Sequence, residues 1–106
     1  MPSPFERFQT SMTKDNLWIY VLKLLEKRDL YPYEVREEVK KQFGFSPGNM
    51  TAYIVLKKLR AEGFVKKTGS TNGKGPKRTY FTITAKGREE LAKAIAFYKN
   101  IGRNFK

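Results

Sequence analysis

Residues 63–88 read GFVKKTGSTNGKGPKRTYFTITAKGR, and this stretch decides the fold. Its two ends, 64–68 and 78–83, are short segments rich in β-branched and aromatic residues, and the second has the alternating pattern of a half-buried strand. Between them lies a run of Gly, Ser, Asn and Pro, in which Gly and Asn supply the positive φ that turns need. The stretch therefore predicts a β-hairpin with a basic tip.

The charge of the chain is concentrated in the same stretch. Residues 63–88 hold seven Lys and Arg and no Asp or Glu, within a chain of 106 residues that carries a net charge of +12. A solvated surface normally mixes both signs, so the imbalance favours a binding face over a surface that merely faces water. A polyanion is the partner that such a face suits, and nucleic acid is favoured over an acidic membrane or an acidic protein.

Three helices are predicted ahead of the hairpin, each from apolar side chains at three- or four-residue spacing. The expected starts are Thr13, Tyr31 and Ser46, where a capping side chain or a following proline favours the first helical turn. Gly44 and Gly63 are the expected stops of the second and third helices. The expected core positions are Leu17, Val21, Leu24, Leu25, Val35, Val39, Phe43, Ala52, Leu56 and Leu59.

A last helix is predicted after the hairpin, with Thr84 as its cap. Apolar residues recur along it for four turns, and nothing that follows in the sequence would cover them. We therefore expect this stripe to pair with its twofold mate in a homodimer, with the N-terminal phenylalanines against it. The expected dimer residues are Phe5, Phe8, Leu91, Ile95, Tyr98, Ile101 and Phe105.

The composition argues against catalysis and metal binding. Cys and His are both absent, which removes thiolate zinc sites, iron–sulfur clusters and the usual general base. The carboxylate pairs Glu37-Glu38 and Glu89-Glu90 are helical neighbours that point about 100° apart, so neither pair converges on one substrate. We expect no enzyme activity, no cofactor and no metal. The longest apolar run, Leu17–Leu22, is far shorter than the ~20 residues of a membrane span, and the expected location is the cytoplasm, at the nucleoid.

The order helix, helix, helix, hairpin is that of the winged helix-turn-helix, an α+β fold. A chain of this length supports one domain. We expect an N-terminal arm or short helix over 1–12, the winged-helix domain over 13–84 and a dimerisation helix over 85–106. One helix of such a domain fits the major groove of duplex DNA, where each base pair shows a distinct pattern of donors and acceptors. Winged helices also serve as protein-interaction modules.

The residues also resemble the PadR family of transcriptional regulators over about 17–90. The resemblance departs at Pro32, where that family usually has Gly, and the short C-terminal helix is similar to that of its small subclass. MarR-type and archaeal winged-helix proteins share much of the pattern. The matching residues are Leu24-Leu25, Tyr31-Pro32-Tyr33-Glu34, Tyr53, Leu56, Leu59, Gly63-Phe64-Val65 and the run Lys77–Arg88.

The resemblance implies that the start of the third helix faces DNA, through Ser46, Asn49, Thr51 and Tyr53. Helical spacing agrees in part, because it places Asn49, Tyr53, Lys57 and Arg60 off the core face. For Tyr53 the alternative is a core aromatic, and for Asn49 and Thr51 it is capping of the first turn. Lys57 and Lys58 are expected to contact DNA, with a solvated face as the alternative. In the wing, Lys74, Lys77 and Arg78 are expected to contact phosphates.

The function predicted is sequence-specific binding of double-stranded DNA by a homodimer that regulates transcription, as a repressor. Two recognition helices would enter successive major grooves of a palindromic operator, about 34 Å apart. The alternatives are an architectural, chromatin-type DNA-binding protein and a winged-helix module that binds protein without binding DNA. A small-molecule effector would fit an apolar pocket between the wing and the dimer helix, but no polar pattern specifies one.

Overall fold

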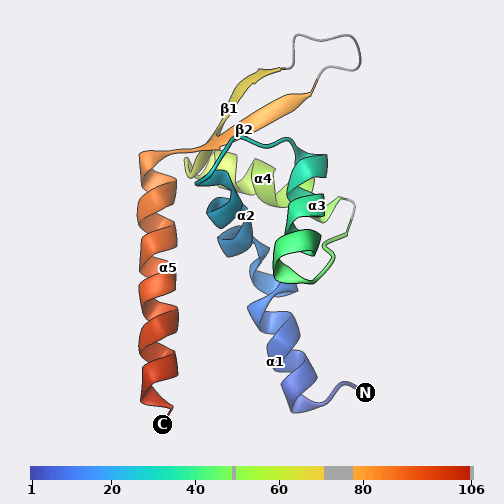
Figure 1. Cartoon of the computed structure of the whole chain (residues 1–106), viewed down its shortest axis with the longest axis vertical. Helices are drawn as coiled ribbons and strands as arrows, with labels where there is room; N and C mark the ends of the chain where they lie inside the picture. Colours follow the sequence, from blue (N-terminus) through green and yellow to red (C-terminus); the bar gives the residue numbers. More distant parts are fainter. Residues whose placement is uncertain (49, 71–77, 106) are drawn as a thin grey trace.

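A bundle of helices carries a two-stranded antiparallel sheet at one end, and both chain termini lie at the other end (Figure 1). The computed structural model describes residues 1–48, 50–70 and 78–105. In chain order the elements are α1 (Pro4–Met12), the 3-10 helix η1 (Lys14–Asn16), α2 (Leu17–Leu25), α3 (Pro32–Phe43), α4 (Thr51–Ala61), β1 (Val65–Ser70), β2 (Thr79–Ile83) and α5 (Ala85–Asn104).

The hydrophobic core is built around α2, which packs against α3, α4, α5 and β2. All of the expected core positions are buried except Phe43, whose ring instead meets that of Tyr20 edge-on at 4.9 Å. Each large side chain that is fully buried contributes roughly 1.5–3 kcal/mol to the hydrophobic stabilisation. The hairpin and α5 join this core through Val65, Phe81, Ile83 and Leu91, and Leu30 joins it from the segment between α2 and α3.

The wing is anchored to the helices by backbone pairing. β1 and β2 pair with Val65 opposite Ile83 and Lys67 opposite Phe81, with an irregularity towards Ser70. Leu30, in the segment between α2 and α3, pairs with Phe81 through two hydrogen bonds of 3.2 and 2.8 Å. The α+β winged helix-turn-helix predicted from the sequence is confirmed. The expected turn covered residues 69–76: Gly69 and Ser70 belong to β1, and the rest of that turn lies outside the described residues.

Most helix ends are where the sequence predicts them. Gly44 and Gly63 have φ of 79° and 85°, the left-handed conformation that ends α3 and α4. The Glu34 carboxylate accepts a hydrogen bond from the Tyr31 backbone N–H at the start of α3. Thr84 accepts one from the Gly87 N–H at 3.0 Å, which caps α5.

Two expected helix starts are wrong. Thr13 is the N-cap residue of η1 and not of α2, which begins at Leu17, and its side chain makes no cap because the hydroxyl donates back to the Gln9 carbonyl at 2.6 Å. Ser46 lies in the loop before α4, which begins at Thr51. The reason is tertiary: Pro47 is buried, and its carbonyl accepts a hydrogen bond from the Arg36 side chain of α3 at 3.3 Å.

The two terminal helices project beyond the core. α1 has no buried residue, and α5 buries only Gly87 and Leu91 in its first two turns. The molecule measures 53 × 33 × 22 Å, and its radius of gyration is 15.1 Å, against about 13 Å for a domain of this length. Among the residues that the structure describes, no helix is long and apolar enough to cross a membrane.

Candidate nucleic-acid interface

α4 turns one face to the core and the opposite face to solvent. Ala52, Leu56 and Leu59 are buried, whereas Tyr53 and Lys57, which lie off that buried face, are exposed. Tyr53 is 43% exposed, so it is not a core aromatic. The Lys57 ammonium lies over its ring, 5.6 Å from the centroid. This outward face is the surface that a winged helix offers to a DNA groove.

The outward face of α4 changes character along its length. Its N-terminal end carries Met50 and Ile54, which are 63% and 46% exposed. Its C-terminal end carries cations, Lys57 and Arg60. The outward face therefore combines an apolar end with a basic end.

The basic end continues onto the sheet through a groove between α4 and β1. The groove, of about 240 Å³, is lined by Tyr53, Lys57, Arg60 and Lys67, together with Ala61 and Phe81, and by no carboxylate. Sequence reasoning did not select Arg60 and Lys67 as site residues. The sequence could have located Lys67. Residues directly opposite each other in an antiparallel pair lie on the same face of the sheet, and the partner of Lys67 is the buried Phe81. Lys67 therefore lies on the face of the hairpin that is turned towards α4.

Lys58 belongs to a different surface. It lines a pocket with Asp15, Glu62 and Glu90, on the flank of α4 that meets η1 and α5. Lys14 lines the same pocket, and in the described part of the chain Lys58 forms no ion pair with any of these carboxylates. The structure therefore separates the two lysines that the sequence grouped together.

The base of the wing carries the third part of the surface. Arg78 is exposed beside β2, and its guanidinium lies over the Tyr31 ring. Tyr31 in turn meets Tyr80 edge-on, with ring centroids 5.4 Å apart, and stacks on Tyr33 at 6.5 Å. The expected wing residues Lys74 and Lys77, and Asn49 ahead of α4, lie outside the described residues. Ser46 and Thr51 are exposed on either side of that gap.

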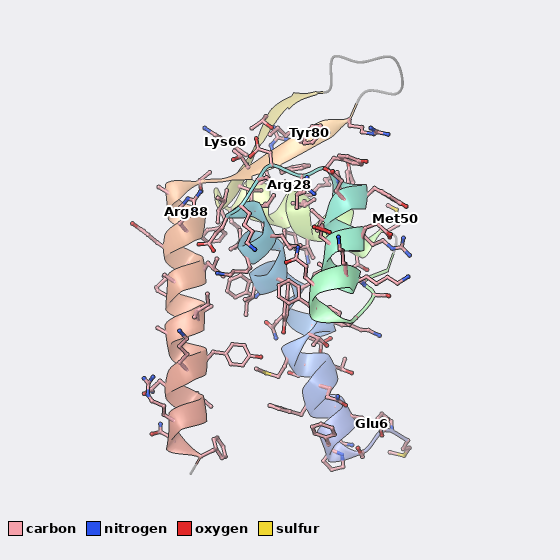
Figure 2. The ribbon with its side chains drawn as sticks, viewed as in Figure 1. Glu6, Arg28, Met50, Lys66, Tyr80 and Arg88 are labelled. Carbon is pink, nitrogen blue, oxygen red and sulfur yellow. The ribbon has the colours of Figure 1, made fainter. Side chains whose placement is uncertain are left out.

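The cations of this surface are available to an external anion. In the described part of the chain, the ion pairs join Lys23 to Glu26, Arg28 to Glu34 and Glu38, Arg36 to Glu37, and Lys93 to Glu90. Lys57, Arg60, Lys66, Lys67 and Arg78 are in none of them. Figure 2 shows Lys66 and Tyr80 on the hairpin, well away from Glu6 at the foot of α1. The basic surface thus lies at the hairpin end of the molecule.

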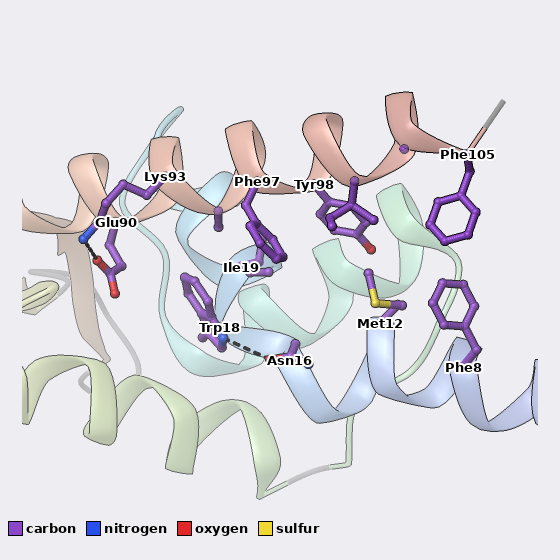
Figure 3. A pocket seen from close by; sticks show the side chains of 13 residues that line it. Phe8, Met12, Asn16, Trp18, Ile19, Glu90, Lys93, Phe97, Tyr98 and Phe105 are labelled. Atoms are coloured by element: carbon purple, nitrogen blue, oxygen red, sulfur yellow. Dashed lines mark hydrogen bonds and ion pairs between the residues drawn. The ribbon is translucent and has the colours of Figure 1, made fainter.

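A second surface is an apolar groove of about 890 Å³ between α1 and α5 (Figure 3). Its walls are aromatic or thioether side chains, chiefly Phe8, Met12, Trp18, Phe97, Tyr98 and Phe105. At one end Lys93 pairs with Glu90 at 2.7 Å, and this hydrogen bond raises the pKa of the Lys93 ammonium. Tyr20 lies next to two residues of the groove, donating its hydroxyl to the Met12 carbonyl; burial raises the pKa of its phenol, and the neighbouring Tyr98 raises it further.

The expected dimer residues divide between this groove and the core. Phe8, Tyr98, Ile101 and Phe105 line the groove, and Phe5 is exposed on α1. The prediction is wrong for Leu91, which is only 1% exposed because the core of its own chain covers it, so it cannot contact a partner. Ile95 is half-buried against the same core. Sequence reasoning missed Phe97, which is 67% exposed in the groove, although it follows Ala94 at helical spacing.

A helix-turn-helix core with an anchored wing and an unpaired basic face defines the class of winged-helix DNA-binding proteins. The sequence model of the PadR-like family of transcriptional regulators matches residues 21–93, and the chain belongs to that family. The resemblance noted in the sequence is therefore confirmed, and the protein is a transcriptional regulator. No curated protein matches the sequence significantly.

Solved structures of this family share the fold. A PadR family transcription regulator from Clostridium difficile is 26% identical, with a TM-score of 0.74 over 82% of this chain and 91% of that one. A PadR-like regulator from Bacillus cereus is also 26% identical, with a TM-score of 0.74 over 91% of each chain. Bacillus subtilis PadR, in a complex with operator DNA, is 30% identical, with a TM-score of 0.68 over 74% of this chain and 46% of that one.

Proposed function

We propose that this protein binds a specific operator in double-stranded DNA as a homodimer and represses transcription by occupying it. The observation that carries the proposal is the outward face of α4, where unpaired cations continue from the helix onto β1. The Bacillus subtilis relative, whose structure contains operator DNA, supports the same role for the fold. A bound dimer would exclude RNA polymerase from the sequence it covers, and it would do so at the nucleoid.

In this proposal α4 enters the major groove and the wing reaches the flanking backbone. Ser46, Asn49, Thr51 and Tyr53 contact DNA around the start of the helix, because N-terminal residues of a recognition helix meet base edges. Lys57 contacts phosphate, joined by Arg60 and Lys67 of the α4–β1 groove. Lys74, Lys77 and Arg78 contact phosphates from the wing. Lys58 lines a different pocket, with Asp15, Glu62 and Glu90, and we expect it to contribute less to DNA binding than Lys57 does.

The homodimer is proposed on the α1–α5 groove. Phe5, Phe8, Phe97 and Phe105 are all more than half exposed, on α1, on α5 or directly after α5. α1 has no buried residue, and α5 has only two. An exposed apolar surface of this extent typically marks a protein–protein interface. A second copy that laid its own α1 and α5 into the groove would cover these rings. Two copies would present two α4 helices, which suits a palindromic operator.

Selection of bound fragments from genomic DNA, followed by footprinting, tests the proposal. We expect one palindromic motif, with two protected half-sites about one helical turn apart. Continuous coating without a motif would indicate an architectural protein instead. No binding to any duplex at physiological salt would indicate a protein-interaction module. Sedimentation at tens of micromolar is expected to give a dimer.

A further inference from the structure

The apolar end of α4 is not explained by the phosphate contacts proposed above. Met50 and Ile54 lie on the outward face, about one helical turn from each other, and both are largely exposed. They are absent from the lining of the α1–α5 groove, so a dimer formed there leaves them uncovered. In Figure 2, Met50 lies on the opposite side of the molecule from α5. Two apolar side chains therefore remain in water beside the cations of the same helix.

Met50 and Ile54 lie on the surface that is proposed to bind DNA. Ile54 precedes Lys57 by three residues and Lys58 by four, so its side chain lies on the helix surface between these two cations. If Lys57 contacts a backbone phosphate, Ile54 lies close to the major groove, because the phosphates form the edges of that groove. Residues at the N-terminal end of a recognition helix are those that reach base edges. The apolar end of α4 is thus continuous with the basic surface and would face bases.

Only one group on a major-groove base edge suits an apolar side chain. Thymine presents its C5-methyl there, whereas the other edges present donors and acceptors such as guanine N7 and O6 or cytosine N4. Covering those polar groups with carbon would remove their water without replacing its hydrogen bonds, which is unfavourable. We infer that Ile54 and Met50 select thymine through its C5-methyl group. This inference rests on the proposed function.

The two side chains would contribute differently. Ile54 is β-branched and sits within α4, where its χ1 angle is almost fixed, so it presents a preformed apolar contact. Met50 precedes the first turn and has a flexible, polarizable thioether, which adapts to the neighbouring base step. Its backbone carbonyl accepts the Ile54 N–H at 2.9 Å, and this bond holds the two residues in register. Ile54 should therefore carry most of the discrimination.

Deoxyuridine tests the inference, because it lacks only the methyl group and keeps the hydrogen-bonding pattern of thymine. The probe is the duplex selected with the full-length protein, with each thymine replaced in turn by deoxyuridine. We expect one or two positions in each half-site at which the replacement weakens binding about three- to fivefold, the effect of one buried methyl-sized group. The same positions should show no penalty in Ile54→Ala and a reduced penalty in Met50→Ala. Ile54→Val is the milder variant, and it should retain part of the penalty.

Lys57→Ala is the matched control on the same face. It should bind more weakly to both duplexes and keep the full deoxyuridine penalty. A wild-type protein that binds its selected duplex equally well with and without the methyls overturns the inference and leaves the proposed function standing. A penalty that persists unchanged in Ile54→Ala and Met50→Ala overturns it too, as does an Ile54→Ala variant that sediments as a smaller species. Failure to select any duplex would remove the proposed function first.

Discussion

The guanidinium carbon of Arg78 lies 4.8 Å from the centroid of the Tyr31 ring. This cation–π contact joins the base of the wing to the residue that precedes α3, next to the backbone pairing of Leu30 with Phe81. A side chain held in this way loses less rotamer freedom when it meets a phosphate. Arg78 is therefore a preorganised cation, in contrast to a lysine free in solvent.

Arg78→Ala should flatten the salt dependence of DNA binding. Each phosphate contact contributes roughly −0.9 to the slope of log K against log salt, so two wings would lose up to about 1.8. The affinity loss should be the same for operator and random duplex, because phosphates carry no sequence information. Titrations followed by fluorescence anisotropy, at salt concentrations from about 50 to about 200 mM, measure both the salt slope and the loss of affinity. Arg103→Ala, at the far end of α5, is the control of equal charge and should keep the wild-type slope.

Arg60→Ala and Lys67→Ala should each behave as phosphate-contact variants. Both cations line the α4–β1 groove without a carboxylate, so each should flatten the slope by up to about 1.8 in a dimer. Lys58→Ala removes the same charge from the other flank of the same helix, where it lines a pocket with Asp15, Glu62 and Glu90. Its slope should match the wild type. Equal effects from all three variants would mean that only net charge matters and that α4 has no defined docking face.

The sequence predicts the parts of the fold that depend on local pattern. One-sided apolar spacing identified the core faces of α2, α3 and α4, and Gly44 and Gly63 marked helix ends because their backbones need positive φ. The expected helix start at Ser46 is wrong because the Arg36 side chain, eleven residues before Pro47 in the chain, holds the Pro47 carbonyl outside the helix. A cap pattern cannot reveal such a tertiary contact.

The surfaces were harder to predict than the core. The apolar stripe of α5 was visible in the sequence, but only the packing of α5 on α2 decides that Leu91 belongs to the core. Arg60 and Lys67 come together only because β1 folds back along α4, so neither residue is notable alone. Periodicity locates a face, whereas the neighbouring elements decide what that face does.

Asn49→Ala should lower the preference for the operator. An Asn at the start of a recognition helix can donate and accept in a pair with adenine, and losing that pair is expected to cost about 1–3 kcal/mol on the selected site. Binding to random duplex should change much less. Titrations of both duplexes with the variant give the two losses. If the losses are equal, Asn49 positions the helix and does not read a base.

Gly87→Ala should destabilise the fold sharply. A Cβ at this position would lie 2.1 Å from the Phe64 carbonyl oxygen and 2.8 Å from Ile83 Cγ1, and the first of these is backbone that cannot rotate away. Overpacking of this kind costs on the order of 1–3 kcal/mol. Urea unfolding at one fixed protein concentration measures the change, because dimerisation makes stability concentration-dependent.

Gly102→Ala is the matched control for that substitution. Gly102 lies near the end of the same helix, where it lines the α1–α5 groove, and its Cβ would meet nothing within 4 Å in its own chain. Because that groove is the proposed dimer interface, this variant and the wild type are compared at a protein concentration low enough for both to be monomeric. Alanine is favoured over glycine in a helix interior by about 0.5–1 kcal/mol, so this variant should be slightly more stable than the wild type. A Gly87→Ala protein as stable as Gly102→Ala would show that α5 can shift away from Phe64 at little cost.

Phe97→Asp should separate the proposed dimer without unfolding the monomer. Phe97 is 67% exposed within one copy, so the monomer loses little packing, whereas the dimer would bury an unpaired carboxylate. That burial costs about 3–5 kcal/mol, which weakens association by at least 100-fold. Sedimentation at tens of micromolar should give a monomer for the variant and a dimer for the wild type, with unchanged circular dichroism. Operator affinity should fall about 10²- to 10⁴-fold, because two linked half-site contacts become one.

Ile54→Asp places the same charge on the outward face of α4, away from the α1–α5 groove, and should leave the sedimentation unchanged. A wild-type protein that sediments as a monomer would contradict both the dimer and the palindromic operator.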